Sequence, residues 1–165
     1  MVSTADVKRL RDETGAGVMD SKRALEESAG DFDAAKEILR QRGVASAAKR
    51  ADRTTSEGLI ESYIHGDRLG ALVEVQCETD FVARTDTFRT LARDIAMQVA
   101  AMNPAAIEVD DVPDDAVGAR EDNALLTQTF IKDSSRTIND LVQETIAQTG
   151  ENIRVARIAR FELGD

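Results

Sequence analysis

The stretch "LGALVEVQCETDFVAR" (residues 69–84) joins a predicted strand to a predicted helix at a sharp corner. Its first half alternates between apolar and other residues, the pattern of a strand with one buried face. The apolar members are Leu69, Ala71, Val73, Val75 and Cys77. The run "LIESYI" (59–64) precedes it across "HGDR" (65–68), so we expect a β-hairpin. Where the second strand ends, an acid and an aromatic residue, Asp80 and Phe81, stand side by side.

The chain beyond this corner alternates between helical and strand patterns. Apolar residues recur at helical spacing from Phe88 to Met102, and "NP" at 103–104 ends that predicted helix, which we expect to lie across the sheet. Thr137 is the expected N-cap of another helix that ends at Gly150. The run "IRVARIARFEL" (153–163) predicts a last strand, so residues 57–165 are expected to form an α+β domain.

The first fifty residues predict a compact unit of three short helices. We expect the first to begin at Thr4 as N-cap, with Val7 and Leu10 facing inward. "GD" at 30–31 separates the second helix from a third, which is expected to end at Gly43. The predicted domain thus covers residues 1–50. The polar, aperiodic "ADRTTS" (51–56) predicts a linker.

Composition excludes several classes of protein. With 42% hydrophobic residues in 165, the chain can bury a core. Its formal charge of −10 would repel a phosphate backbone, so we expect no direct binding of nucleic acid. No apolar run approaches the length of a membrane span, and the first residues lack the apolar core of a signal peptide. We therefore expect a cytoplasmic protein that does not enter a membrane.

Candidate residues for catalysis or for metal binding are few. One cysteine, Cys77, excludes an internal disulfide, and one histidine, His65, leaves too few ligands for zinc. "TGAG" (14–17) follows no strand and lacks the third glycine of a dinucleotide site, and the chain contains no phosphate-binding loop. The acids of residues 108–122, a predicted loop or short exposed helix, lack the spacing of a calcium loop. We expect no cofactor, no metal site and no catalytic residue.

The corner residues Asp80 and Phe81 permit two interpretations. In the first, Phe81 packs under the hairpin while Asp80 caps the next turn, and spacing alone favours this one. In the second, Phe81 is an exposed wedge that enters a gap in a partner protein, and its acidic neighbour disturbs a polar site beyond.

Four stretches resemble one known family. They are "VKRLRDETGAGVMDSKRALEESAGD" (7–31), "HGDRLGALVEVQCETDFVAR" (65–84), "FIKDSSRTIND" (130–140) and "GENIRVARIARFELGD" (150–165). Together they resemble translation elongation factor Ts, the guanine-nucleotide exchange factor for elongation factor Tu. The resemblance implies an α+β protein: an N-terminal ubiquitin-associated-like three-helix domain, then an α+β core with a small antiparallel sheet packed on helices.

The resemblance also implies two groups of partner-binding residues and reverses the preference at the corner. A wedge that dislodges magnesium near the nucleotide of the partner would comprise Thr79, Asp80, Phe81 and Val82. An N-terminal docking group would comprise Arg11, Val18, Met19, Lys22 and Arg23. Similar proteins often have Met at the position of Val18 and Cys at that of Ser21. The implied activity is release of GDP from elongation factor Tu during translation elongation, with no covalent chemistry, so the chain is not expected to be an enzyme.

The length of the chain bears on its assembly. Many similar proteins have a core of two similar halves, and only one half is visible here. Short relatives are similar to half of the long core and form homodimers, so we expect a homodimer through the core domain; a hairpin and a C-terminal strand left unpaired would expose an adhesive edge. One alternative is a non-catalytic protein-binding and dimerisation module. Another, an enzyme, depends only on His65, Cys77 and the acids.

Overall fold

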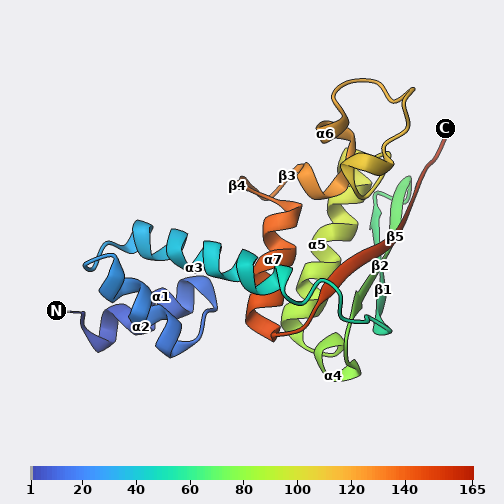
Figure 1. Cartoon of the computed structure of the whole chain (residues 1–165). Coiled ribbons are helices and arrows are strands. Elements are labelled where there is room, and N and C mark those ends of the chain that lie inside the picture. The colour runs from blue at the N-terminus through green and yellow to red at the C-terminus, as the bar shows by residue number, and fades with distance from the viewer. Residues whose placement is uncertain (1) are drawn as a thin grey trace.

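The computed structural model describes residues 2–165, and its first three helices form a small unit of their own (Figure 1). They are α1 (Thr4–Thr14), α2 (Val18–Glu27) and α3 (Phe32–Ala48). The expected N-cap at Thr4 is wrong by one residue, because Ser3 caps α1 through a capping box with Asp6. Gly15, with φ of 68°, ends α1 in the left-handed conformation that glycine adopts without strain. The buried apolar residues of this unit are Val7, Leu10, Ala24, Leu25 and Ala35.

The third helix is longer than predicted. It was expected to end at Gly43 but continues to Ala48, and its second half packs on α7 (Ile138–Thr149). Ala47 is buried there in the main hydrophobic core. A glycine in a helix costs only about 1 kcal/mol relative to alanine, so the packing of the last turns outweighs its low propensity.

The sheet has three antiparallel strands in the order β1-β2-β5. β1 (Glu57–His65) and β2 (Leu69–Cys77) form the predicted hairpin, and β5 (Ile153–Glu162) is the predicted last strand. β5 pairs with β2, with a shift of register between Glu74 and Val75. The C-terminal strand is therefore not left unpaired within the chain.

Helices cover one face of this sheet. α4 (Asp80–Ala83) forms the corner after β2, and α5 (Asp86–Met102) lies across the sheet as predicted. α7 lies beside α5 (Figure 1). The predicted helix ends are confirmed, with Asn103 and Gly150 in the left-handed conformation and Thr137 as an N-cap in a capping box. The fold is thus α+β, with a small antiparallel sheet on helices.

The segment between α5 and α7 is mostly irregular, and its acidic part was predicted as a loop or a short exposed helix. It contains short elements only: η1 (Val109–Asp111), α6 (Arg120–Asn123), η2 (Leu125–Thr127), β3 (Thr129–Phe130) and β4 (Asp133–Thr137). The sequence did not predict the β3–β4 hairpin. Fully buried Gln98 of α5 holds it, since its amide donates to the carbonyl of Thr129 (3.1 Å) and accepts from the N–H of Ile131 (3.0 Å). Within residues 2–165, no helix has the length and apolar character to cross a membrane.

Candidate functional site

The corner after β2 presents an aromatic ring to solvent. Thr79 is the N-cap of α4 and its hydroxyl accepts from the N–H of Val82 (3.3 Å), which starts the helix at Asp80. Phe81 is 77% exposed, so the interpretation in which it packs under the hairpin is wrong, as is the expectation that Asp80 caps the turn. Val82 points the other way and is buried in the main core. The structure thus separates an exposed Phe81 from a buried anchor one residue later.

Asp80 lies next to this ring and is also accessible. Its carboxylate pairs with Arg84, one turn later, at 3.0 Å. Both side chains are more than half exposed, so this pair contributes little to stability and can exchange for another partner.

Two acids that the sequence did not single out hold the corner from the side. The carboxylates of Glu78 and Glu151 form hydrogen bonds that join the end of β2 to the start of β5. Glu151 follows Gly150 at the end of α7, far from the corner in sequence. The sequence gives no signal for this contact, because a single acid after a glycine that ends a helix is ordinarily a surface residue. The contact becomes visible only in the fold, where the two segments lie together.

The predicted N-terminal docking residues fall on two helices. Val18, Met19, Lys22 and Arg23 all lie on the exposed side of α2, whose opposite side buries Ser21, Ala24 and Leu25. Val18 and Met19 are 52% and 58% exposed in the first turn, and because they are adjacent they form a small hydrophobic surface. Arg11 lies in the last turn of α1, where it pairs with Asp12 at 2.9 Å.

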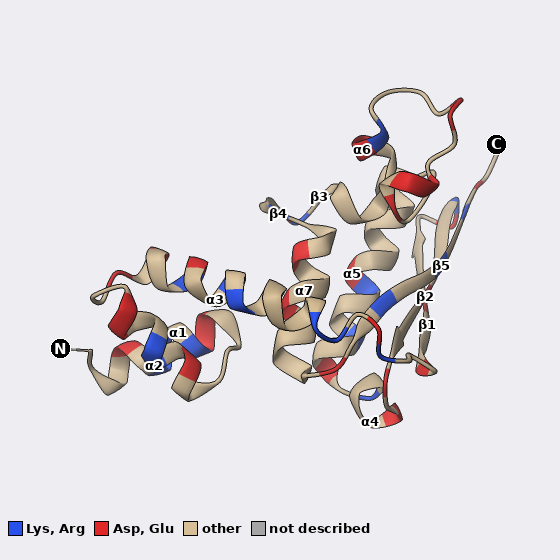
Figure 2. Cartoon of the chain, in the orientation of Figure 1, with Lys and Arg blue, Asp and Glu red and all other residues tan. Residues whose placement is uncertain are grey.

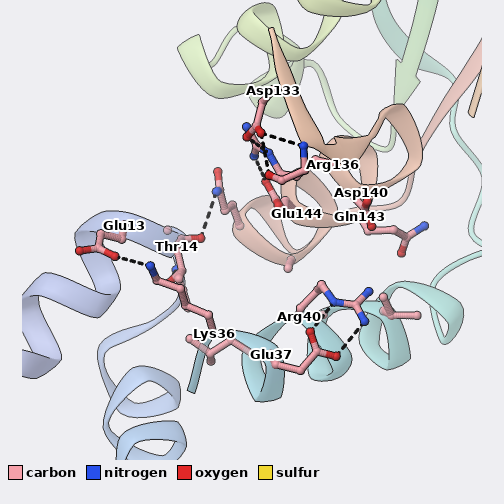
Figure 3. A pocket seen from close by; sticks show the side chains of 18 of the residues that line it. Glu13, Thr14, Lys36, Glu37, Arg40, Asp133, Arg136, Asp140, Gln143 and Glu144 are labelled. Atoms are coloured by element: carbon pink, nitrogen blue, oxygen red, sulfur yellow. Dashed lines mark hydrogen bonds and ion pairs between the residues drawn. The ribbon is translucent and has the colours of Figure 1, made fainter. Parts of the chain in front are cut away.

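A groove of about 850 Å³ separates α1 and α3 from β4 and α7 (Figure 3). Its charged side chains are mostly paired with one another: Lys36 with Glu13 (2.6 Å), Arg40 with Glu37 (2.8 Å), and Arg136 with both Asp133 and Glu144 (2.8 Å each). Burial raises the pKa of Glu144, while Arg136 opposes that shift. Asp12, Asp33 and Asp140 also line the groove and pair with none of its three bases, so acids are in excess there.

The two residues on which an enzymatic interpretation depends are poorly placed for catalysis. Cys77 is fully buried, and burial, reinforced by the charge of Glu151, raises its pKa to about 11. Near neutral pH it is a protonated thiol, which is a weak nucleophile. His65 lies at the exposed end of β1, with its Nδ1 3.4 Å from the hydroxyl of Tyr63.

The distribution of charge and of possible ligands offers no other site. In Figure 2, acidic and basic residues are interspersed along α1, α2 and α3 and form no continuous basic stripe on these helices. Within residues 2–165, no group of three or more His, Cys, Asp or Glu side chains could hold a metal ion.

Comparison with known proteins gives one consistent result. The family model described as "Elongation factor TS" matches residues 32–123. Elongation factor Ts of Carboxydothermus hydrogenoformans is 45% identical over 196 aligned positions, which cover 100% of this chain and 90% of that protein. The same factor of Moorella thermoacetica is 44% identical, over 100% of this chain and 97% of its own length.

A longer relative matches as well. Elongation factor Ts of Thermosynechococcus vestitus is 47% identical over 99% of this chain, but the match covers only 66% of that protein. The first two alignments extend over 196 positions against 165 residues, so at least 31 aligned positions have no counterpart here. The chain is therefore similar to short forms of this factor and shorter than they are.

Proposed function

The chain belongs to the elongation factor Ts family, and we propose from this that it binds elongation factor Tu and promotes the release of GDP during translation elongation. In this role it acts by binding, without covalent chemistry and without contact to nucleic acid. The cytoplasm is where such a role would be exercised.

The observation that carries the proposal is the exposed ring of Phe81. A phenylalanine that is 77% exposed on a capped turn gains roughly 1.5–3 kcal/mol when a partner buries it. The turn is anchored by the buried Val82 and by the N-cap Thr79, so the ring can enter a gap in the partner without the turn first having to become ordered. These are the properties of a wedge.

Asp80 supplies the chemistry beside the wedge. A magnesium ion at a nucleotide site keeps several waters and needs near-ideal octahedral geometry, so a small displacement of the groups that hold those waters weakens retention of the nucleotide. The carboxylate of Asp80 is more than half exposed next to Phe81 and can compete for such groups. Thr79 and Val82 hold the two in place.

The N-terminal unit would provide the docking contact. The exposed side of α2, with Val18, Met19, Lys22 and Arg23, and the neighbouring Arg11 offer an apolar centre with a charged rim, as many interfaces do. Linkage then requires that the wedge fits the nucleotide-free partner better than the GDP-bound one, since equal affinity for both would shift nothing.

A homodimer through the core domain is part of the same proposal. The face of the sheet turned away from α5 carries no helix (Figure 1). It exposes four large apolar side chains: Ile60 (66%), Ile64 (64%), Leu72 (48%) and Phe161 (73%). An open apolar sheet face is costly in water, and a second copy could cover it by a two-fold interface. The feature that supports a homodimer is therefore this apolar face of the sheet, and not the unpaired strand edge that we expected.

The test is the rate at which a fluorescent GDP analogue leaves purified elongation factor Tu, with magnesium present, when this chain is added. We expect strong acceleration by the unmodified chain, and a roughly 10- to 100-fold smaller effect for Phe81→Ala, given the area that the ring can bury. Val117→Ala is the matched control, because Val117 is a 93% exposed apolar residue in the irregular segment.

The same experiment decides between this function and a plain binding module. Binding without any change in the GDP release rate would refute the exchange function and leave a non-catalytic docking and dimerisation protein. Acceleration that Phe81→Ala and Val117→Ala reduce equally would show that exchange does not depend on the wedge.

A further inference from the structure

The carboxylate of Glu151 accepts three hydrogen bonds from the corner that carries Phe81. The backbone N–H groups of Glu78 and Thr79 donate to one oxygen, at 3.2 and 3.0 Å, and the Thr79 hydroxyl donates to the other at 2.6 Å. Hydrogen bonds to a charged acceptor are about twice as strong as neutral ones. The end of β2 is therefore held by a side chain from the end of α7.

The bond to the Thr79 hydroxyl also sets the cap of α4. A hydroxyl has one proton to donate and lone pairs to accept with. Because its proton goes to Glu151, the Thr79 oxygen is left to accept from the N–H of Val82, at 3.3 Å. Glu151 thus orients the group that starts the helix in which Phe81 stands.

A reciprocal set of bonds completes the contact. The N–H of Asn152 donates to the carboxylate of Glu78 at 2.7 Å, so each of the two segments donates a hydrogen bond to the acid of the other. The side-chain amide of Asn152 donates to the carbonyls of Ala51 (3.1 Å) and Arg53 (2.9 Å), in the connection between α3 and β1. The clasp, defined as Glu78, Thr79, Glu151 and Asn152, therefore joins the corner, the start of β5 and the segment that leads from the N-terminal helices.

Phe81 has no comparable support of its own. It is 77% exposed, so packing does not hold it, and the backbone of the corner sets the direction in which its side chain leaves the turn. Given the proposed exchange function, on which this step rests, we propose that Glu151 is a positioning residue that holds Phe81 in the orientation needed to open the partner's nucleotide site. It acts through Thr79, without itself displacing the nucleotide.

The experiment measures GDP release from elongation factor Tu over a range of concentrations of the full-length Glu151→Gln variant. Glutamine keeps the shape but has one acceptor oxygen in place of two, so at least one bond to the corner is lost. We expect the maximal release rate to fall roughly tenfold, since small misplacement of a working group is costly, while the half-saturating concentration changes less than about twofold.

Asp133→Asn is the matched control. The carboxylate of Asp133 also accepts from a backbone N–H and a hydroxyl, both of Ser135 (3.1 and 2.6 Å), and from Arg136 (2.8 Å), but it lies on β4 away from the corner. Its loss should lower thermal stability by a similar amount and leave the maximal rate unchanged. Glu78→Ala removes the acceptor of the Asn152 N–H and must show the same defect as Glu151→Gln, which keeps the test decisive if Glu151→Gln does not fold.

A double variant separates positioning from other roles. If Glu151 acts through Phe81, then Glu151→Gln has no further effect on the maximal rate in a chain that already carries Phe81→Ala. An additional loss there, or a defect no larger than that of Asp133→Asn, overturns the positioning role while the exchange function stands. No acceleration by the unmodified chain refutes the exchange function, and with it the role of Glu151 in exchange.

Discussion

At the scale of single residues, burial decides which side chains near the corner are accessible to a partner protein. Phe81 is 77% exposed and its neighbour Val82 only 5%, because successive side chains of the helix that Thr79 caps point about 100° apart. Cys77, two residues before Thr79, lies fully inside and donates its thiol proton to the Thr79 carbonyl at 3.1 Å. The thiol is thus withheld from a partner, whereas Asp80, Phe81 and Arg84 are accessible to one.

The buried thiol of Cys77 predicts how stability depends on alkaline pH. Its pKa is about 11 in the folded chain against an ordinary value of 9.0, so the unfolded state loses its proton first as the pH rises. Stability from this group is complete below pH 9 and is lost as the pH passes through 11, amounting to about 3 kcal/mol. Urea unfolding between pH 8 and 11 should show a steeper decline for the unmodified chain than for Cys77→Ala. Parallel pH profiles would mean that the thiol is not desolvated in solution.

At the scale of elements, α3 links the N-terminal unit to the core. It spans 17 residues, and its first half belongs to the small hydrophobic cluster of α1 and α2 while Ala47 belongs to the main core. On the other side of the groove, the amide of Gln148 on α7 reaches the carbonyl of Thr14 at 3.4 Å. The helical unit is therefore held to the core by a continuous helix as well as by the linker.

Gly43 gives a direct test of the contact between α3 and α7. A Cβ atom built at Gly43 would lie 3.5 Å from the Cβ of Ala147, which is an ordinary contact distance. Gly43→Ala should therefore raise the free energy of unfolding by about 0.5–1 kcal/mol, through the better helix propensity of alanine. Gly43→Leu adds atoms where α7 already lies and should lower it by about 1–3 kcal/mol. Equal stability of the two variants in urea would show that α3 does not pack on α7 at this point.

The sequence predicted those elements whose signals are local. Alternation identified β1 and β2, helical periodicity identified α5, and the cap residues Thr137 and Gly150 marked α7. The sequence did not indicate the β3–β4 hairpin for two reasons. β3 has only two residues, and β4, "DSSRT", is polar and shows no apolar alternation. The extension of α3 past Gly43 was missed because tertiary packing stabilises it.

Some residues of the candidate site could likewise be located from the sequence, and others could not. The exposed pair Asp80 and Phe81 could be located from the sequence, although spacing alone favoured a buried ring. Glu151 could not be found, because it lies 72 residues from Thr79 in the chain and only the fold brings the two together. Contacts between distant segments leave no periodic signal in one sequence.

At the scale of the whole molecule, the two proposed partner-binding surfaces belong to a single connected body. α2 carries most of the docking group, and α3 runs from the N-terminal helices onto α7 (Figure 1). Glu151, which follows the end of α7, bonds to the corner that carries Phe81. Docking by α2 would then bring Phe81 to one region of the partner at little additional cost in entropy.

The uncovered face of the sheet yields the last prediction. Phe161 lies opposite Gly70 on β2, on the same face as Leu72 and as Ile64, whose side chain covers Gly70 from the neighbouring strand. A second copy that covers this face would remove these side chains from water, and a charge placed among them would be buried without a partner. Phe161→Asp should therefore convert a particle of twice the chain mass of 17.9 kDa into a monomer, as measured by light scattering at micromolar concentration. We expect the thermal midpoint of the unmodified chain to rise with protein concentration, and that of Phe161→Asp to be independent of it. Val117→Asp, at a 93% exposed position, should change neither property. A monomeric mass for the unmodified chain would refute the dimer and leave this face without a partner.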